Sequence, residues 1–97
     1  MATKTPTAGL TERVDRFLSY LEVEWADVPR VAHEWDSWTE DKRLDFVLEW
    51  SIREDRLHSL REICERGEMS PEQRARFAQL ETVVARNRAA VDRLLAE

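Results

Sequence analysis

Residues 70–97 read SPEQRARFAQLETVVARNRAAVDRLLAE, and this stretch decides the fold. Ser70 can accept a hydrogen bond from the backbone N–H of Gln73, whose side chain can reach back, which is the capping box of a helix N-terminus. Pro71 follows, where a missing N–H costs nothing. Residues then recur at alternating spacings of three and four: Phe77, Leu80, Val84, Asn87, Val91 and Leu94. The pattern predicts one uninterrupted helix over residues 71–96 with a single apolar stripe.

A second long helix is predicted directly upstream, over residues 40–66, with Gly67 as its C-terminal stop. Its first stripe repeats at spacings of four and three and consists of Phe46, Trp50, Arg53, Leu57, Leu60 and Cys64. Because only Glu68 and Met69 separate Gly67 from the next helix cap, the two helices must be antiparallel neighbours. We expect their stripes to meet.

The N-terminal half of this second helix is apolar on nearly all sides, because another set of residues lies opposite the first stripe. This set consists of Leu44, Val47, Leu48, Ser51 and Ile52. A helix of this kind is covered on both sides, so we expect the first helix of the chain to cover the half nearer Leu44. The other half is then thinly protected, around Leu57, Ile63, Phe77 and Leu80.

The first helix is predicted over residues 11–28, with Thr11 as its N-cap and residues 1–9 as a flexible tail. Its apolar face consists of Val14, Phe17, Leu18, Leu21, Trp25 and Val28. Pro29 must end or bend this helix, since its ring clashes with the carbonyl group four residues earlier. The sequence leaves open whether residues 29–35 form a separate short turn or continue the helix past a kink.

These elements predict an all-α protein with one domain over residues 10–97, a three-helix protein built on a long antiparallel helical hairpin. The short first helix is expected to cover only part of this hairpin. We therefore expect dimerisation, or binding of a helical partner protein, to complete the fold, because contiguous exposed apolar patches usually mark interfaces.

Charge and composition exclude several functional classes. The formal net charge is −5, so the chain lacks the basic footprint of a nucleic-acid-binding protein. No apolar run approaches the length of a membrane span, and no secretory signal is visible. Cys64 is the single cysteine, so no internal disulfide can form, which fits a reducing compartment. We expect a cytoplasmic protein that binds neither nucleic acid nor membranes.

Two polar residues interrupt the stripes and are candidate register-setting residues. Asn87 lies in the middle of one stripe, and Arg53 lies in the other. A buried polar side chain costs stability unless it finds a partner, and one such Asn can fix the register of paired helices. Both residues lie at similar distances from the turn, so they can pair. The alternative is that Arg53 reaches water and Asn87 lies at the edge of its stripe.

Two surface regions are candidate partner-binding sites. Residues 22–41 contain seven acids, one base and three Trp residues, a mixture that suits a basic partner through electrostatic steering and cation–π contact. Small residues on the outer side of the last helix would let another helix approach closely. The candidate residues are Trp35, Asp36, Trp38, Ala78, Ala85 and Ala89. The alternatives are that the Trp residues close the end of the bundle and that the Ala residues serve helix propensity.

Metal binding and catalysis have weaker support. Asp55 and His58 are three residues apart and can share a helical face, as do the ligands of the Glu-x-x-His motif in di-iron helical proteins. No second motif of this kind exists, so a site would need completion by dimerisation. Cys64 continues an apolar stripe, and Gly-rich phosphate loops are absent. We predict no catalytic residue and no cofactor.

The leading functional hypothesis is a small protein–protein interaction module that acts through helical surfaces. An adaptor, an antitoxin-like inhibitor and an assembly factor all belong to this class. The alternative is a small helical metalloprotein whose carboxylate and His site, with Asp55 and His58, is completed by dimerisation.

Overall fold

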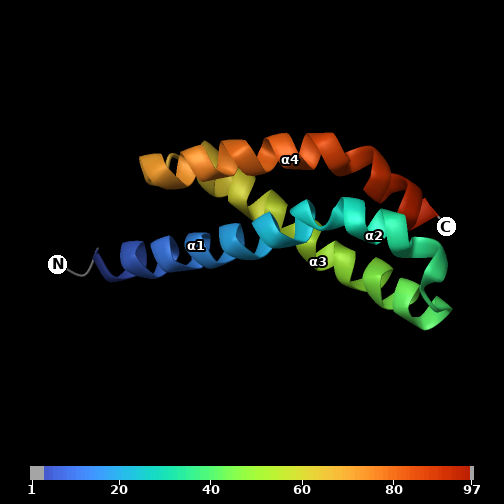
Figure 1. The fold of residues 1–97 in the computed structure, drawn as a ribbon. Helices are drawn as coiled ribbons and strands as arrows, with labels where there is room; N and C mark the ends of the chain where they lie inside the picture. The colour runs from blue at the N-terminus through green and yellow to red at the C-terminus, as the bar shows by residue number, and fades with distance from the viewer. Residues whose placement is uncertain (1–3, 97) are drawn as a thin grey trace.

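Three helical rods lie along one another in the computed structural model, which describes the backbone of residues 4–96 and the side chains of residues 9–96 (Figure 1). α1 (Lys4–Ala26) and α2 (Val28–Glu34) form the first rod, and the 3-10 turn η1 (Trp35–Ser37) connects it to the second. α3 (Glu40–Glu65) and α4 (Pro71–Ala96) are the second and third rods. The described residues contain no strand, so the predicted all-α fold with three helices on a helical hairpin is confirmed.

The turn of the hairpin has the caps that its sequence predicts. The Gly67 N–H donates to the Cys64 carbonyl oxygen at 3.0 Å, and the Glu68 N–H donates to the Ile63 carbonyl oxygen at 3.1 Å. This is a Schellman motif, and its αL residue is Gly67, with φ of 75°. The capping box of α4 is also formed. Gln73 N–H donates to Ser70 Oγ at 3.1 Å, and Ser70 N–H donates to Gln73 Oε1 at 3.0 Å.

α1 begins at Lys4, earlier than the predicted start at Thr11. Thr11 therefore lies inside the helix and is not its N-cap, and residues 4–9 of the predicted tail are helical. Pro6 does not oppose this start, because it falls in the first turn, where a helix needs no N–H donor. Residues 1–3 lie outside the described part.

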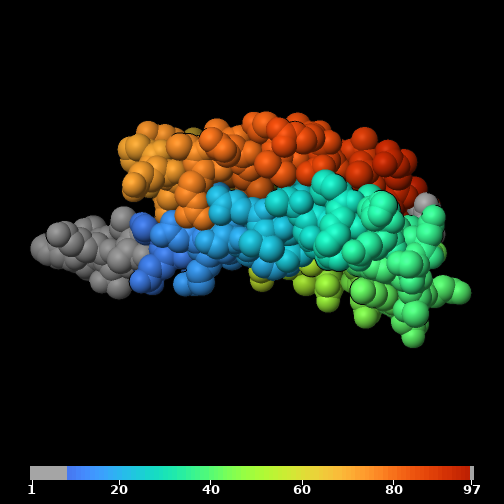
Figure 2. All heavy atoms as spheres, viewed as in Figure 1, coloured from blue at the N-terminus to red at the C-terminus, as the bar shows by residue number. Residues whose placement is uncertain are grey.

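α1 covers the half of the hairpin next to its turn, which is the opposite half from the one expected. Gln73, at the start of α4, donates to the Thr11 carbonyl oxygen at 3.2 Å and to the Asp15 carboxylate at 2.9 Å. Arg76 pairs with the Glu22 carboxylate at 2.8 Å. α2 packs on α4 further along. The first rod therefore accompanies α4 for most of its length, and the two form one face of the molecule in Figure 2.

This placement reverses both expectations about exposed apolar surface. The residues expected to be thinly protected are at most 6% exposed: Leu57, Ile63, Phe77 and Leu80. Those expected beneath the first helix are exposed: Leu44, Leu48 and Ile52. The reason is that α3 has two apolar sides, and the first rod packs against the side that carries Phe46 and Trp50. The half of the hairpin that was expected to be uncovered is buried, so it gives no reason to expect dimerisation.

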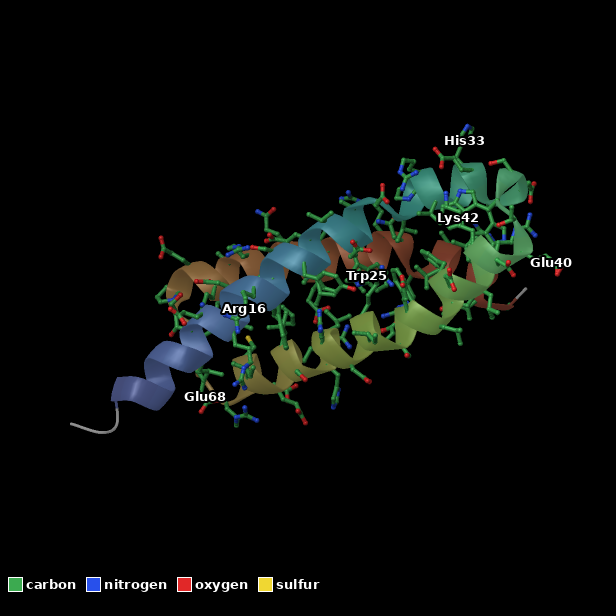
Figure 3. All side chains as sticks on the ribbon, turned by 90° about the horizontal axis from the view of Figure 1, so that it is seen from below. Arg16, Trp25, His33, Glu40, Lys42 and Glu68 are labelled. Carbon is green, nitrogen blue, oxygen red and sulfur yellow. The ribbon has the colours of Figure 1, made fainter. Side chains whose placement is uncertain are left out.

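Aromatic rings fill the core where the first rod, η1 and α3 meet. Trp25 and Trp50 pack edge to face with ring centroids 5.0 Å apart, and Phe46 stacks on Trp50 at 5.1 Å. Trp35 packs against Phe46 at 5.5 Å and closes the end of the bundle. Figure 3 shows Trp25 between α1 and α3. Such rings bury large areas and dominate the energetics of a core.

The bend between α1 and α2 follows from Pro29, and a side chain of α4 compensates for it. Pro29 has no N–H, so the Trp25 carbonyl oxygen, four residues earlier, cannot receive its helical hydrogen bond. Asn87 Nδ2 donates to this oxygen at 3.1 Å, and Asn87 is 8% exposed. Asp27, between the two helices, keeps right-handed helical backbone angles. The chain therefore continues past a kink, which decides the alternative that the sequence leaves open.

Asn87→Ala is expected to lower the free energy of unfolding by about 1–3 kcal/mol, because the buried Trp25 carbonyl group then lacks a donor. In a Pro29→Ala background, the N–H of residue 29 can serve that oxygen, so the same substitution should cost at least about 0.5 kcal/mol less. Urea denaturation of the four proteins of this double-mutant cycle measures both costs. Equal costs in the two backgrounds would contradict the role of Asn87 as the replacement donor.

Candidate functional site

The two register-setting candidates do not pair with each other, because both bind α1 instead. Arg53 donates through Nε and Nη2 to Glu24 Oε1 at 2.9 and 2.6 Å. Asn87 donates to the carbonyl oxygen of the next residue, Trp25. Arg53 is only 8% exposed, and its guanidinium lies 5.2 Å from the Trp50 ring, so it does not reach water either. α3 and α4 are thus tied to one point of the first rod.

The tryptophans that were expected to meet a basic partner make their contacts inside the protein. Trp35 is buried, and the Arg43 guanidinium donates to its carbonyl oxygen at 3.0 Å and to that of Asp36 at 3.1 Å. Trp38 is half-buried, and Lys42 Nζ lies 4.3 Å from its ring centroid. Lys42 thus takes up a cation–π contact that was expected from a partner. Asp36 and the half-buried Trp38 remain accessible.

The predicted alanine stripe lies on the exposed side of α4. Ala78, Ala85 and Ala89 are all exposed. Their methyl groups offer little apolar area, and alanine has the highest helix propensity, which explains its presence on an exposed helical face without any partner. Their role in partner binding stays a prediction.

Asp55 and His58 do not belong to a metal-binding cluster. The His58 side chain is 71% exposed, and its Nε2 lies 3.4 Å from the Glu62 carboxylate of the next helical turn. Within residues described by the structure, no three His, Cys, Asp or Glu side chains gather closely enough to hold a metal ion. His33 points away from the bundle in Figure 3. The metalloprotein alternative therefore gains no supporting observation.

Three exposed apolar residues in line on α3 form the feature that the sequence interpretation placed wrongly. Leu44 is 54% exposed, Leu48 is 62% exposed and Ile52 is 46% exposed. Residues four apart lie on the same side of a helix, so these three form a continuous surface, called the apolar strip from here on. Val23 is the other large apolar residue exposed among those described, and it stands alone on α1. The period of the sequence reveals this apolar side of α3 but predicts that the first helix covers it.

A hollow of about 490 Å³ lies at the N-terminal end of the apolar strip. Its lining residues are Trp35, Glu40, Arg43, Leu44, Val47 and Leu95. Four of these six are apolar, and they come from η1, α3 and the last turn of α4. The hollow thus joins the strip to the end of α4 and suits an apolar side chain more than a charged one.

Acidic side chains border the apolar strip without ion pairs of their own. They are Glu40, Asp41, Asp45 and Asp55, and all four are exposed. Among the residues that the structure describes, none of the four forms a salt bridge. An unpaired exposed carboxylate contributes fully to the field at the surface. The border of the strip is therefore negative.

Salt bridges to α4 hold α3 from another side of the helix and leave the strip uncovered. The Glu54 carboxylate pairs with Arg88 and accepts a hydrogen bond from Trp50 Nε1 at 2.9 Å. Burial by itself raises the pKa of Glu54, but the hydrogen bonds from Arg88 and Trp50 outweigh it and leave the pKa below its usual value of 4.5. Arg61 and Glu81 form a second bridge at 2.8 Å, and this hydrogen bond raises the pKa of Arg61.

No protein-family model matches this chain, and comparisons with curated proteins and with solved structures find no match either. Along residues 4–96, no helix has the length and the apolar composition that a membrane crossing requires.

Glu54 makes stability depend on pH in the acidic range. A carboxylate whose pKa is lower in the folded state contributes stability above its unfolded pKa, and this contribution is lost as the pH falls through the folded pKa. The free energy of unfolding should therefore decline as the pH falls below about 4.5. Glu54→Gln cannot titrate, so it should be less stable at neutral pH and show a shallower decline.

Urea denaturation at a series of pH values measures this decline for both proteins. Asp92→Asn, which changes an exposed acid on the outer side of α4, is the matched control and should follow the native protein. If the native protein and Glu54→Gln declined in parallel, Glu54 would not be the group responsible.

Proposed function

We propose that this chain is a small protein–protein interaction module and that its partner binds the apolar strip of α3. The observation that carries this proposal is the exposure of Leu44, Leu48 and Ile52 in line on a helix whose other sides are held by the bundle. Single exposed apolar residues are ordinary on soluble proteins, but a contiguous set beside an apolar hollow is typical of an interface.

The exposed half of each strip side chain has no apolar contact that would explain its composition. Its side chains are about half exposed, so a polar residue at one of these positions would cost about 1 kcal/mol or less. Covering the strip on a partner gains about 1 kcal/mol per residue, roughly half the value of burying a whole side chain. The hollow beside Leu44 adds a place for one anchoring side chain, and such anchors carry most of the energy of an interface.

An adaptor, an antitoxin-like inhibitor and an assembly factor would all use such a surface. All three bind a protein partner and catalyse no reaction, and this kind of binding is the function proposed.

Site-specific photo-cross-linking in the native host tests this proposal. A benzophenone side chain replaces Leu48 in one protein and Val23 in another, since both positions are exposed by similar fractions on different helices. Mass spectrometry then identifies the adducts. We expect one protein to be captured from position 48 and from neighbouring positions 44 and 52, and not from position 23.

Stability measurements accompany the cross-linking. Leu48→Ser and Val23→Ser should each change the free energy of unfolding by less than about 1 kcal/mol, because both side chains are mostly exposed. Leu48→Ser should abolish capture of the same protein from position 44, whereas Val23→Ser should not. Folded protein that gives no adduct from any of positions 44, 48 and 52 would overturn the proposal.

A further inference from the structure

The cations near the apolar strip keep their positive charge, but each already has a contact within the fold, and Arg56 lies over the Phe17 and Tyr20 rings. Lys42 lies over the Trp38 ring. Arg43 donates to two backbone carbonyl oxygens of η1. Arg53 is buried in its pair with Glu24. A partner that approaches the strip therefore meets the unpaired carboxylates of the border. Few cations of this chain are free to pair with them.

A second copy of this chain fits the strip poorly. In a two-fold symmetric antiparallel pair centred on Leu48, Leu44 of each copy meets Ile52 of the other, and Asp41 comes next to Asp55. A parallel pair places every acid beside its own counterpart. Like charges brought together at an interface cost free energy. Both arrangements bring acids together, although the antiparallel pair also places Glu40 beside Arg56. The dimer that the sequence suggested is thus disfavoured at this face.

The strip and its border have the dimensions of a helix-binding site. Residues 40–55 extend for roughly 24 Å along α3, about four helical turns. An amphipathic helix binds such a surface with apolar residues at spacings of three and four. One large apolar side chain of that helix can enter the hollow of about 490 Å³ beside Leu44.

We infer that the partner presents a basic amphipathic helix, whose apolar side covers the strip and whose Arg and Lys residues meet the carboxylates of the border. This inference rests on the function proposed above and adds the chemistry of the partner to it. The apolar contact supplies most of the affinity, while the charges increase the rate of association and select against acidic helices.

Three synthetic helical peptides test the inference on the full chain. The basic peptide carries Leu along one side and Arg and Lys elsewhere. The acidic peptide has Glu at each Arg and Lys position, and the third peptide keeps the cations but has Gln at each Leu position. By fluorescence anisotropy, we expect the basic peptide to bind at least about tenfold more tightly than either of the others. Added salt should weaken its binding severalfold, because exposed charges are screened.

Two triple variants with the same change in net charge locate the effect. The first removes acids of the border: Asp41→Asn, Asp45→Asn and Asp55→Asn. The matched control removes exposed acids from α1 and α4: Glu12→Gln, Glu72→Gln and Asp92→Asn. We expect the first variant to bind the basic peptide at least about fivefold more weakly than the native protein and the control to change by less than about twofold.

The outcomes separate this inference from the proposed function. If the acidic peptide binds as tightly as the basic one, if no peptide binds, or if the two triple variants behave alike, the partner is not a basic helix. A Leu48-dependent adduct in the cross-linking experiment would then still support the proposed function. Sedimentation that shows a Leu48-dependent dimer of the chain alone identifies a second copy as the occupant and overturns the inference.

Discussion

The carbonyl oxygen of Trp25 has no helical donor, because the residue four positions later is Pro29. A buried carbonyl group without a hydrogen-bond donor would destabilise the fold. The side-chain amide of Asn87, on α4, supplies this donor. The chain can therefore bend at Pro29 without leaving the hairpin. α1 and α2 act as one rod beside α4. The contact between Asn87 and Trp25 thus determines which sides of the hairpin this rod covers.

The position of the first rod determines which side of α3 meets water. Glu24, directly before Trp25, binds Arg53, so the same point of α1 is fixed to both long helices. With the rod on the side of Phe46 and Trp50, Leu44, Leu48 and Ile52 stay about half exposed. The exposed strip is thus a consequence of how the core is assembled.

Apolar area and charge act on different properties of this surface. In the proposed complex, the strip and the hollow provide the affinity, because covering them releases water from apolar atoms. In the same proposed complex, the acidic border selects among partners, because its carboxylates form no salt bridge within the described chain and favour a surface that offers Arg or Lys. The chain's own cations at this end of α3 do not pair with these carboxylates: Lys42 contacts the Trp38 ring, Arg43 donates to backbone carbonyl groups beside the hollow, and Arg53 is buried with Glu24.

The sequence by itself determined the features that depend on neighbouring residues. These are the two long helices, the capping box at Ser70, the stop at Gly67 and the stripes that line the core, all of which follow from backbone hydrogen bonding and helical period. It also identified Arg53 and Asn87 as polar residues in apolar stripes, since that is a local pattern too.

Only the tertiary structure decided which of the two apolar sides of α3 is buried. Periodicity shows that two sides exist, but it contains no information on where a third helix lies. The hydrogen-bond partner of Asn87 could not be predicted from the sequence for a related reason. It is a backbone group 62 residues away that becomes available only because of Pro29, and such a group leaves no mark in the pattern of side chains. The candidate site, with its hollow and its acidic border, is exposed because of the position of the first rod and the contact between Asn87 and Trp25.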